Sequence, residues 1–229
     1  MVLGSLGLSH QQAKGEQDVT TLLRIDASAR TEGSHSRELA DVVEAAWFKA
    51  NPEGEVIVRD LAREPVALIN NDTIAGYYTP PEQMDEKLKS ATALSDKLIA
   101  EVMLADTLLI SVPMYNFSVP AVLKAWIDQV VRINHTFSYD PENGFAGLIS
   151  NKTAYVTTAV GAQFTGTPFE AFDFLRPYLK SLLAFLGFEK VEVFSVESTT
   201  IDEQQMAINR QEALQQIEAS FSKARQAAA

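Results

Sequence analysis

Short apolar runs alternate with segments of helical periodicity along most of the chain. Five runs have the length and the branched or aromatic composition of buried strands, at residues 21–27, 55–60, 107–112, 153–159 and 191–196. Between them, apolar residues recur at i, i+3, i+4 and i+7, a spacing that places them on one face of a helix. This spacing predicts helices beginning near Leu39 and over residues 84–105, 119–131, 169–186 and 203–224.

The alternation of strands and helices predicts an α/β fold with a mainly parallel sheet. Right-handed crossovers between parallel strands place helices on both faces of such a sheet. With five strands, we expect a doubly wound, flavodoxin-like sheet in the order 2-1-3-4-5. Ligands of these sheets bind outside the carboxyl ends of the strands, so the loops after the first, third and fourth strands are the places to search for a site.

Composition limits the partners of this chain. Its 229 residues, 46% hydrophobic and 21% charged, fit a single globular domain, which we place at residues 21–226 after a loose N-terminal extension of residues 1–20. The net charge of −11 repels nucleic acid and anionic lipid, so neither is an expected partner. No apolar run approaches the roughly 18 residues of a membrane span, and the N-terminus lacks the pattern of a secretory signal. We therefore expect a soluble, cytoplasmic protein.

Cysteine and histidine usage argues against metal chemistry. The chain has no cysteine, which excludes disulfides, thiolate nucleophiles and Cys-ligated clusters. His35 and His135 are not spaced with carboxylates or with each other as metal ligands are. We expect no metal site.

The loop after the first predicted strand is rich in hydrogen-bond donors. It reads Ser-Ala-Arg-Thr-Glu-Gly-Ser-His-Ser and runs into a helix, whose N-terminal N–H groups and partial positive charge attract anions. Ser28, Ser34 and Ser36 add hydroxyl groups. Arg30 adds a positive charge, and His35 adds its backbone N–H. This chemistry favours a phosphomonoester; the alternative is that Ser34 only caps the helix and the other serines are solvated.

Two common nucleotide-binding motifs are absent from this loop. Neither G-x-G-x-x-G nor G-x-x-x-x-G-K-[ST] occurs there. The loop is therefore not expected to hold a dinucleotide permanently or to bind a nucleoside triphosphate. A nicotinamide dinucleotide remains open as a transient second substrate.

The loop after the third predicted strand carries two aromatic rings and an amide. Its residues are Met114, Tyr115, Asn116 and Phe117. Pro120 follows at a position that suits the first turn of a helix. A flat heteroaromatic ring needs polar partners along its rim and apolar surface against its faces, and this loop offers both. We interpret it as a shelf for such a ring, with ordinary packing of the two side chains as the alternative.

Three sequence pieces together resemble the family of FMN-dependent NADH:quinone oxidoreductases and azoreductases. They are the loop with Ser28, Arg30, Ser34 and Ser36; the run Pro113-Met114-Tyr115-Asn116-Phe117 with Leu123, Lys124 and Asp128 in the next helix; and Phe137, Tyr139, Asn143, Gly144, Gly147 and Leu148. The pieces occur in the family's order over most of residues 21–200.

The resemblance implies FMN as the cofactor. Ser28 and residues 34–36 would bind its phosphate and ribityl side, and residues 114–117 would hold the isoalloxazine ring. Family members often carry Ser-Arg-Gly-Gly after the fourth strand. The corresponding turn here is Ala159, Val160, Gly161 and Ala162, in which only Gly161 matches. Side-chain donors for negative charge on the reduced ring are therefore missing, which leaves backbone N–H groups to take that role.

Aromatic residues near the same sheet edge suggest a substrate pocket. We expect Phe117, Tyr139 and Phe164 to line it, with ordinary core packing as the alternative. Residues 62–81 are long and apolar for a connection. By the resemblance they pack at an interface between two copies that share active sites; otherwise they cover their own chain.

The resemblance implies two-electron transfer from NADH or NADPH through FMN to quinones or aromatic azo compounds, by a ping-pong mechanism in a homodimer. Because the cofactor carries this chemistry, no side chain is predicted to be catalytic. Two alternatives remain. One is a flavodoxin-like electron carrier that acts with a protein partner, and the other is a flavin-free domain on the same fold.

Overall fold

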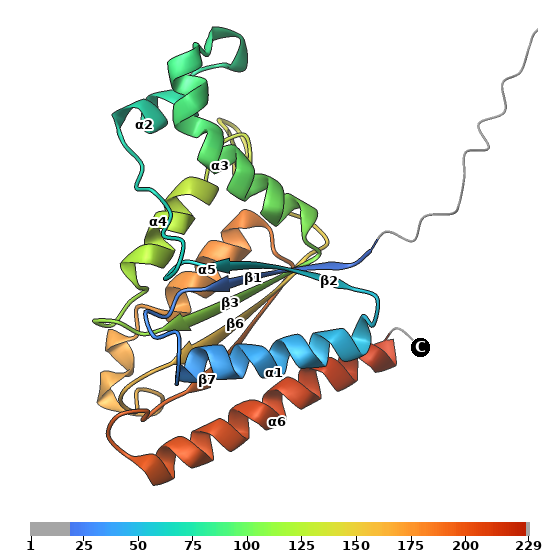
Figure 1. Cartoon of the computed structure of the whole chain (residues 1–229), viewed down its shortest axis with the longest axis vertical. Coiled ribbons are helices and arrows are strands. Elements are labelled where there is room, and N and C mark those ends of the chain that lie inside the picture. Colours follow the sequence, from blue (N-terminus) through green and yellow to red (C-terminus); the bar gives the residue numbers. More distant parts are fainter. Residues whose placement is uncertain (1–18, 228–229) are drawn as a thin grey trace, which may run out of the picture.

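The computed structural model of the protein describes residues 19–227, with side chains through residue 223. Five parallel strands form one sheet: β1 (Thr21–Asp26), β2 (Glu55–Asp60), β3 (Thr107–Pro113), β6 (Thr153–Ala159) and β7 (Lys190–Val196). Their order is β2-β1-β3-β6-β7 (Figure 1), which is the predicted 2-1-3-4-5 when only the strands of this sheet are counted. The five predicted strands are confirmed, and their boundaries differ by at most one residue.

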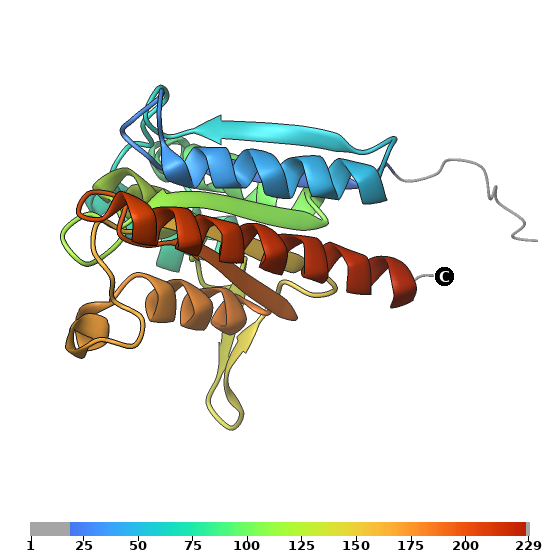
Figure 2. The same ribbon diagram turned by 90° about the horizontal axis from the view of Figure 1, so that it is seen from below.

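Helices cover both faces of this sheet. They are α1 (His35–Ala50) and α6 (Glu203–Ala227) on one face, and α3 (Glu86–Leu104), α4 (Ala121–Val130) and α5 (Arg176–Leu186) on the other. Figure 2 looks onto α1 and α6, which lie side by side. Each face has its own buried core, with Trp47 and Phe221 in the first and Trp126 and Leu183 in the second. Because both faces are covered, β1 and β3 are buried at every position.

The predicted helix over residues 169–186 was wrong in its first half. Residues Pro168–Phe172 form a short 3₁₀ helix, η2, and α5 begins only at Arg176. The Asp173 carboxylate accepts hydrogen bonds from the backbone N–H groups of Leu175 and Arg176, just ahead of a proline that favours a first helical turn. These contacts separate η2 from α5, although the apolar spacing continues across the break.

Two short structures were not predicted. Residues 62–81 contain α2 (Asn71–Tyr78), which begins with a reciprocal capping box between Asn70 and Thr73; η1 (Pro81–Gln83) follows. Strands β4 (Phe137–Asp140) and β5 (Gly144–Gly147) form an antiparallel hairpin that projects from the layers (Figure 2). The eight residues of α2 make little more than two turns, too few for a clear helical periodicity. Strands β4 and β5 have only four residues each, and the two glycines of β5 weaken its strand pattern.

Residues 1–18 of the predicted N-terminal extension lie outside the described part of the chain. The division into an extension and one domain over residues 21–226 stays a prediction. Among residues 19–227, no helix is both long enough and apolar enough to cross a membrane.

Candidate functional site

The loop after β1 presents the N-terminus of α1 at the carboxyl edge of the sheet. Gly33 adopts a left-handed conformation (φ 60°) just before Ser34, which occupies the N-cap position. The Ser34 hydroxyl does not cap the described helix but lies 3.3 Å from the Ser36 hydroxyl. The backbone N–H of Glu38 bonds to the Ser34 carbonyl. The first-turn N–H groups ahead of Glu38 therefore suit an anion, and the interpretation of Ser34 as a simple hydroxyl cap is wrong.

The Ser36 side chain faces the interior of the protein. It is fully buried, and its hydroxyl lies 3.3 Å from that of Ser111 on β3. The Thr157 hydroxyl on β6 donates to the Ser36 carbonyl at 3.0 Å. The Ser36 hydroxyl therefore fixes the start of α1 against the sheet, and its backbone N–H is the better placed donor for a ligand.

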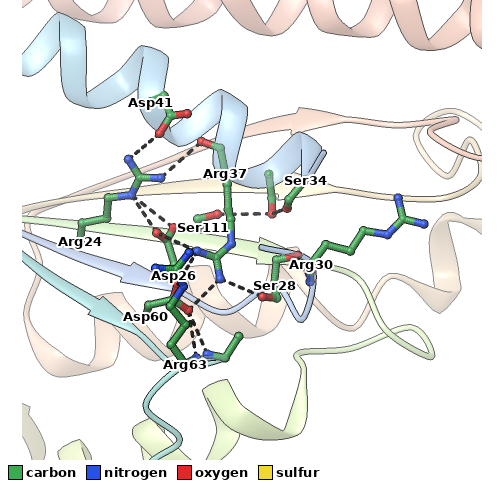
Figure 3. Close-up of polar contacts among 12 residues, drawn as sticks. Arg24, Asp26, Ser28, Arg30, Ser34, Arg37, Asp41, Asp60, Arg63 and Ser111 are labelled. Atoms are coloured by element: carbon green, nitrogen blue, oxygen red, sulfur yellow. Dashed lines mark hydrogen bonds and ion pairs between the residues drawn. The ribbon is translucent and has the colours of Figure 1, made fainter. Parts of the chain in front are cut away.

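A network of arginines and aspartates supports this loop from below (Figure 3). The Arg37 guanidinium donates to both carboxylate oxygens of Asp60, each at 2.8 Å, and to the Ser28 carbonyl at 2.9 Å. It also lies 3.3 Å from the carboxylate of Asp26, which Arg24 contacts from the other side. The two aspartates end β2 and β1 as register partners. Arg37 thus ties the loop after β1 to the ends of two strands.

The two carboxylates of this network respond differently to their surroundings. Bidentate hydrogen bonding from Arg37 holds the pKa of Asp60 below its ordinary value. Burial raises the pKa of Asp26, because the cost of desolvation exceeds the attraction of Arg24 and Arg37. Arg30, by contrast, is exposed and points away from the network (Figure 3), so it is free to meet an anion that arrives from solvent.

Sequence reasoning missed this ion network, although two signals were present. Asp26 and Asp60 both end predicted strands, at the edge where ligands bind. Arg37 stands in the first turn of a helix, where a positive charge is unfavourable without a partner. Together these positions indicate a salt bridge beneath the loop.

The loop after β3 is a tight turn made of residues 114–117, which we call the aromatic turn. Tyr115 and Ser118 exchange two backbone hydrogen bonds of 3.0 and 3.1 Å that close it. Asn116 and Phe117 have φ values of 47° and 71°, a left-handed conformation that costs a residue with a side chain about 1–2 kcal/mol. The backbone N–H of Met114 donates to the Ala159 carbonyl and fixes the turn to the end of β6. Strained backbone of this kind often marks a functional site.

The two loops meet at one contact. The backbone N–H of Ala29 donates to the Tyr115 hydroxyl at 3.3 Å. Tyr115 and Asn116 also border a largely apolar groove with a volume of about 1060 Å³. Other residues that line it are Leu68, Val119, Pro120, Phe174, Pro177 and Tyr178. Donors suited to an anion and an apolar surface suited to a flat ring therefore adjoin each other.

The turn after β6 is held in place by the segment after β7. The carbonyls of Val160 and Gly161 accept hydrogen bonds from the backbone N–H groups of Thr199 and Thr200, each at 3.1 Å. Val160 is buried, and its own N–H donates to a β7 carbonyl. The N–H of Val160 is thus taken, so a ligand beside Ala159 and Val160 would find donors only at Gly161 and Ala162.

Phenylalanines after β6 lie beside the aromatic turn. The rings of Phe164 and Phe172 have centroids 6.2 and 5.9 Å from that of Phe117. The backbone N–H of Phe174 donates to the Phe117 carbonyl at 3.1 Å. We call residues 163–174 the phenylalanine segment. The structure thus brings both Phe164 and Phe172 to Phe117, and the contact with Phe164 is the one that the predicted pocket requires.

Tyr139 does not share that pocket within one chain. It lies on β4 with its ring 4.9 Å from Phe145, which packs near Phe185 at the C-terminal end of α5. The phenylalanine segment meets the other end of α5, and a helix of eleven residues is roughly 16 Å long. Within one chain the hairpin therefore holds Tyr139 away from Phe117, and its place in a substrate pocket stays a prediction.

Comparison with known proteins identifies the family. Residues 20–221 match the family model described as a flavodoxin-like fold. Over 175 residues the chain is 52% identical to the FMN-dependent NADH:quinone oxidoreductase of Xanthobacter autotrophicus, which covers 76% of this chain and 84% of that protein. The chain belongs to this family of flavodoxin-like oxidoreductases. The resemblance seen in the sequence is thereby confirmed.

Further relatives agree with this membership. The FMN-dependent NADH:quinone oxidoreductase of Nostoc punctiforme is 42% identical over 181 residues, which are 79% of this chain and 88% of that protein. Among solved structures, an azoreductase from Bacillus anthracis superposes with a TM-score of 0.82 at 26% identity, covering 90% of this chain and all of that one. The chain therefore shares its overall fold with this azoreductase.

Proposed function

We propose that this protein is an FMN-dependent oxidoreductase that transfers two electrons from NADH to quinones or aromatic azo compounds. The names of its relatives support this function. The observation that carries it is the junction at Ala29 and Tyr115, where the N-terminus of α1 adjoins the aromatic turn. Anion donors next to an apolar shelf match a ligand with a phosphate at one end and a flat ring at the other.

The donors of the site fit FMN. Its phosphate would lie at the first turn of α1, near the N–H groups of residues 34–36 and the Ser34 hydroxyl, and the exposed Arg30 would supply a positive charge. Each hydrogen bond to a charged phosphate contributes about 1.5–3 kcal/mol, so three or four suffice to hold the cofactor. Ser28 would adjoin the ribityl side, and the aromatic turn would hold the ring edge opposite Gly161 and Ala162.

The protein's part in the reaction is to bind, orient and exclude water. Bound FMN supplies reversible two-electron chemistry at its ring, so no side chain needs to act as an acid or a nucleophile. The aromatic turn fixes the plane of the ring, and Phe164 and Phe172 shield its neighbourhood from solvent. The nicotinamide donor and the acceptor occupy the same groove in turn, which gives a ping-pong sequence.

The active form is proposed to be a homodimer. Several large apolar side chains are exposed outside the site; among them, Tyr78 is 75% exposed at the end of α2, and Phe145 is 64% exposed on the hairpin. Exposed aromatic surface of this kind favours a protein interface. Light scattering at micromolar protein should give twice the chain mass, whereas the mass of a single chain would contradict the dimer.

Anaerobic stopped-flow mixing tests the proposed function. The protein reconstituted with FMN should lose its flavin absorbance when NADH is added, and the absorbance should return when menadione, a quinone, follows. Reduction only through a partner reductase would indicate an electron carrier instead. A protein that stays colourless and gains no thermal stability with FMN would refute flavin binding altogether.

A further inference from the structure

A buried carboxylate holds the start of the phenylalanine segment. Glu197 directly follows β7, and only 4% of its side chain is exposed. Its carboxylate accepts hydrogen bonds from the backbone N–H groups of Phe164 and Thr165, at 2.5 and 3.0 Å, and from the Thr165 hydroxyl at 2.5 Å. Three donors from two adjacent residues after β6 thus converge on one side chain that follows β7.

The same carboxylate reaches the far end of the segment through Arg176. The Arg176 guanidinium lies 2.6 Å from Glu197 and also pairs with Asp173, whose carboxylate accepts from the first N–H groups of α5. Glu197 therefore fastens residues 164 and 165 directly and residues 173 and 176 by way of the arginine. We call this group of three charged residues the Glu197 clamp.

The clamped segment carries the rings beside the aromatic turn. Phe164 and Phe172 both pack against Phe117, while Phe169 and Phe174 are largely exposed. Exposed rings have little packing of their own to fix them, so the position of the segment depends on its polar anchors. Removal of a buried charge from such an anchor leaves its partners unpaired and lets the segment shift.

We propose that Glu197 is a positioning residue for the electron acceptor. By holding both ends of the phenylalanine segment, it keeps Phe164 and Phe172 as a fixed wall against which a planar aromatic acceptor lies beside the flavin. This proposal rests on the proposed function of the site. The Glu197 side chain is itself buried, and it acts on the acceptor only through the residues that it holds in place.

Steady-state kinetics of the FMN-loaded enzyme test this role. In Glu197→Gln we expect the KM for menadione to rise about tenfold, because a small displacement of a positioning surface is costly. The kcat and the dissociation constant for FMN should change by less than about twofold, since the flavin and its anchors stay in place. Thr165→Val, which removes one exposed donor and leaves the fold intact, should raise the KM about threefold.

Two comparisons separate positioning from a general loss of structure. Glu192→Gln changes a carboxylate on β7, just before Glu197 in the chain, that pairs with Lys190 and lies away from the segment, so it should leave the KM unchanged. In a Phe172→Leu background, Glu197→Gln should raise the KM by a smaller factor than in the wild type, because one of the two rings that it positions has already been removed.

The outcomes distinguish this proposal from the function on which it rests. If NADH does not reduce the wild-type flavin, the proposed function fails and the positioning role fails with it. If the wild type turns over but Glu197→Gln and Thr165→Val keep the wild-type KM, only the positioning role is wrong. An equal rise of the KM for menadione in Glu192→Gln would also overturn the positioning role. So would a double variant in which the effects of Glu197→Gln and Phe172→Leu on the KM simply multiply.

Discussion

The loop after β1 and the phenylalanine segment border the same site but are built in opposite ways. The loop is short, its serines are buried, and Arg37 fixes it to two strands through paired aspartates. The segment is longer and leaves rings such as Phe169 60% exposed, with the Glu197 clamp as its polar anchor. The loop is held by buried serines and by an ion network at the ends of two strands, and the segment is held mainly by one carboxylate that follows β7.

This difference separates two tasks of the site. A resident cofactor gains affinity from donors that are preorganised before it binds, which suits the loop after β1. An acceptor that enters and leaves at every turnover needs a surface that can adjust, which suits exposed rings on an anchored segment. Substitutions in the loop should therefore act on stability and FMN affinity, and substitutions in the segment on the acceptor.

The largest expected effect is a loss of stability in Arg37→Met. This change leaves Asp60 and Asp26 without their shared partner and should lower the free energy of unfolding by about 3 kcal/mol. Arg30→Met removes an exposed charge and should lower it by less than about 0.5 kcal/mol. Urea unfolding of the two variants measures both values. Equal stability of the two would mean that the network does not hold the loop.

The second expected effect concerns FMN affinity. Ser34→Ala combined with Ser36→Ala removes a ligand donor and the hydroxyl contact that orders the first turn of α1. The dissociation constant should rise about thirtyfold, corresponding to roughly 2 kcal/mol. Tyr139→Ala, far from the loop in its own chain, should change it by less than about threefold. Fluorescence titration measures both, and the reverse order would place the phosphate elsewhere.

The smallest expected effect is a pH dependence at the segment. Burial acts to raise the pKa of Glu197, but hydrogen bonds from Thr165 and Phe164 and the charge of Arg176 outweigh it, so the pKa lies below the ordinary value of 4.5. A lowered folded pKa means that ionised Glu197 stabilises the fold above pH 4.5 and loses this contribution as the pH falls through the folded value. Glu197→Gln should be roughly 1–2 kcal/mol less stable than the wild type at pH 7.

That stability difference should narrow below pH 4.5. Urea unfolding of the wild type and of Glu197→Gln, at several pH values from neutral to acidic, measures this difference. A difference that stays constant down to acid pH would show that the charge of Glu197 contributes nothing to the anchoring of the segment.

The sequence predicts what local patterns encode. The five strands are confirmed because each reads as a short, separate apolar run, and two of them, β1 and β3, are buried at every position. The aromatic turn was recognisable because Tyr115 and Phe117 interrupt such a run next to a proline-led helix. The family was recognisable from three separate pieces in the right order.

The remaining features depend on contacts between distant positions. Arg37 and Asp60 are 23 residues apart, and Glu197 and Phe164 are 33 apart, so no periodicity connects either pair. The helix predicted from residue 169 extended too far because apolar spacing continues through η2, while the break comes from polar contacts at Asp173. Tyr139 was assigned to the pocket from its position after the third predicted helix, and no local pattern shows that β4 and β5 form a hairpin that projects from the layers.

A crystal structure of the FMN complex tests the central claim most directly. The phosphate should lie within about 3 Å of the backbone N–H groups of residues 34–36. The isoalloxazine ring should rest on the aromatic turn, with Phe164 and Phe172 at its border. A complex in which FMN binds elsewhere, or crystals grown in excess FMN that show only solvent at both places, would contradict this site.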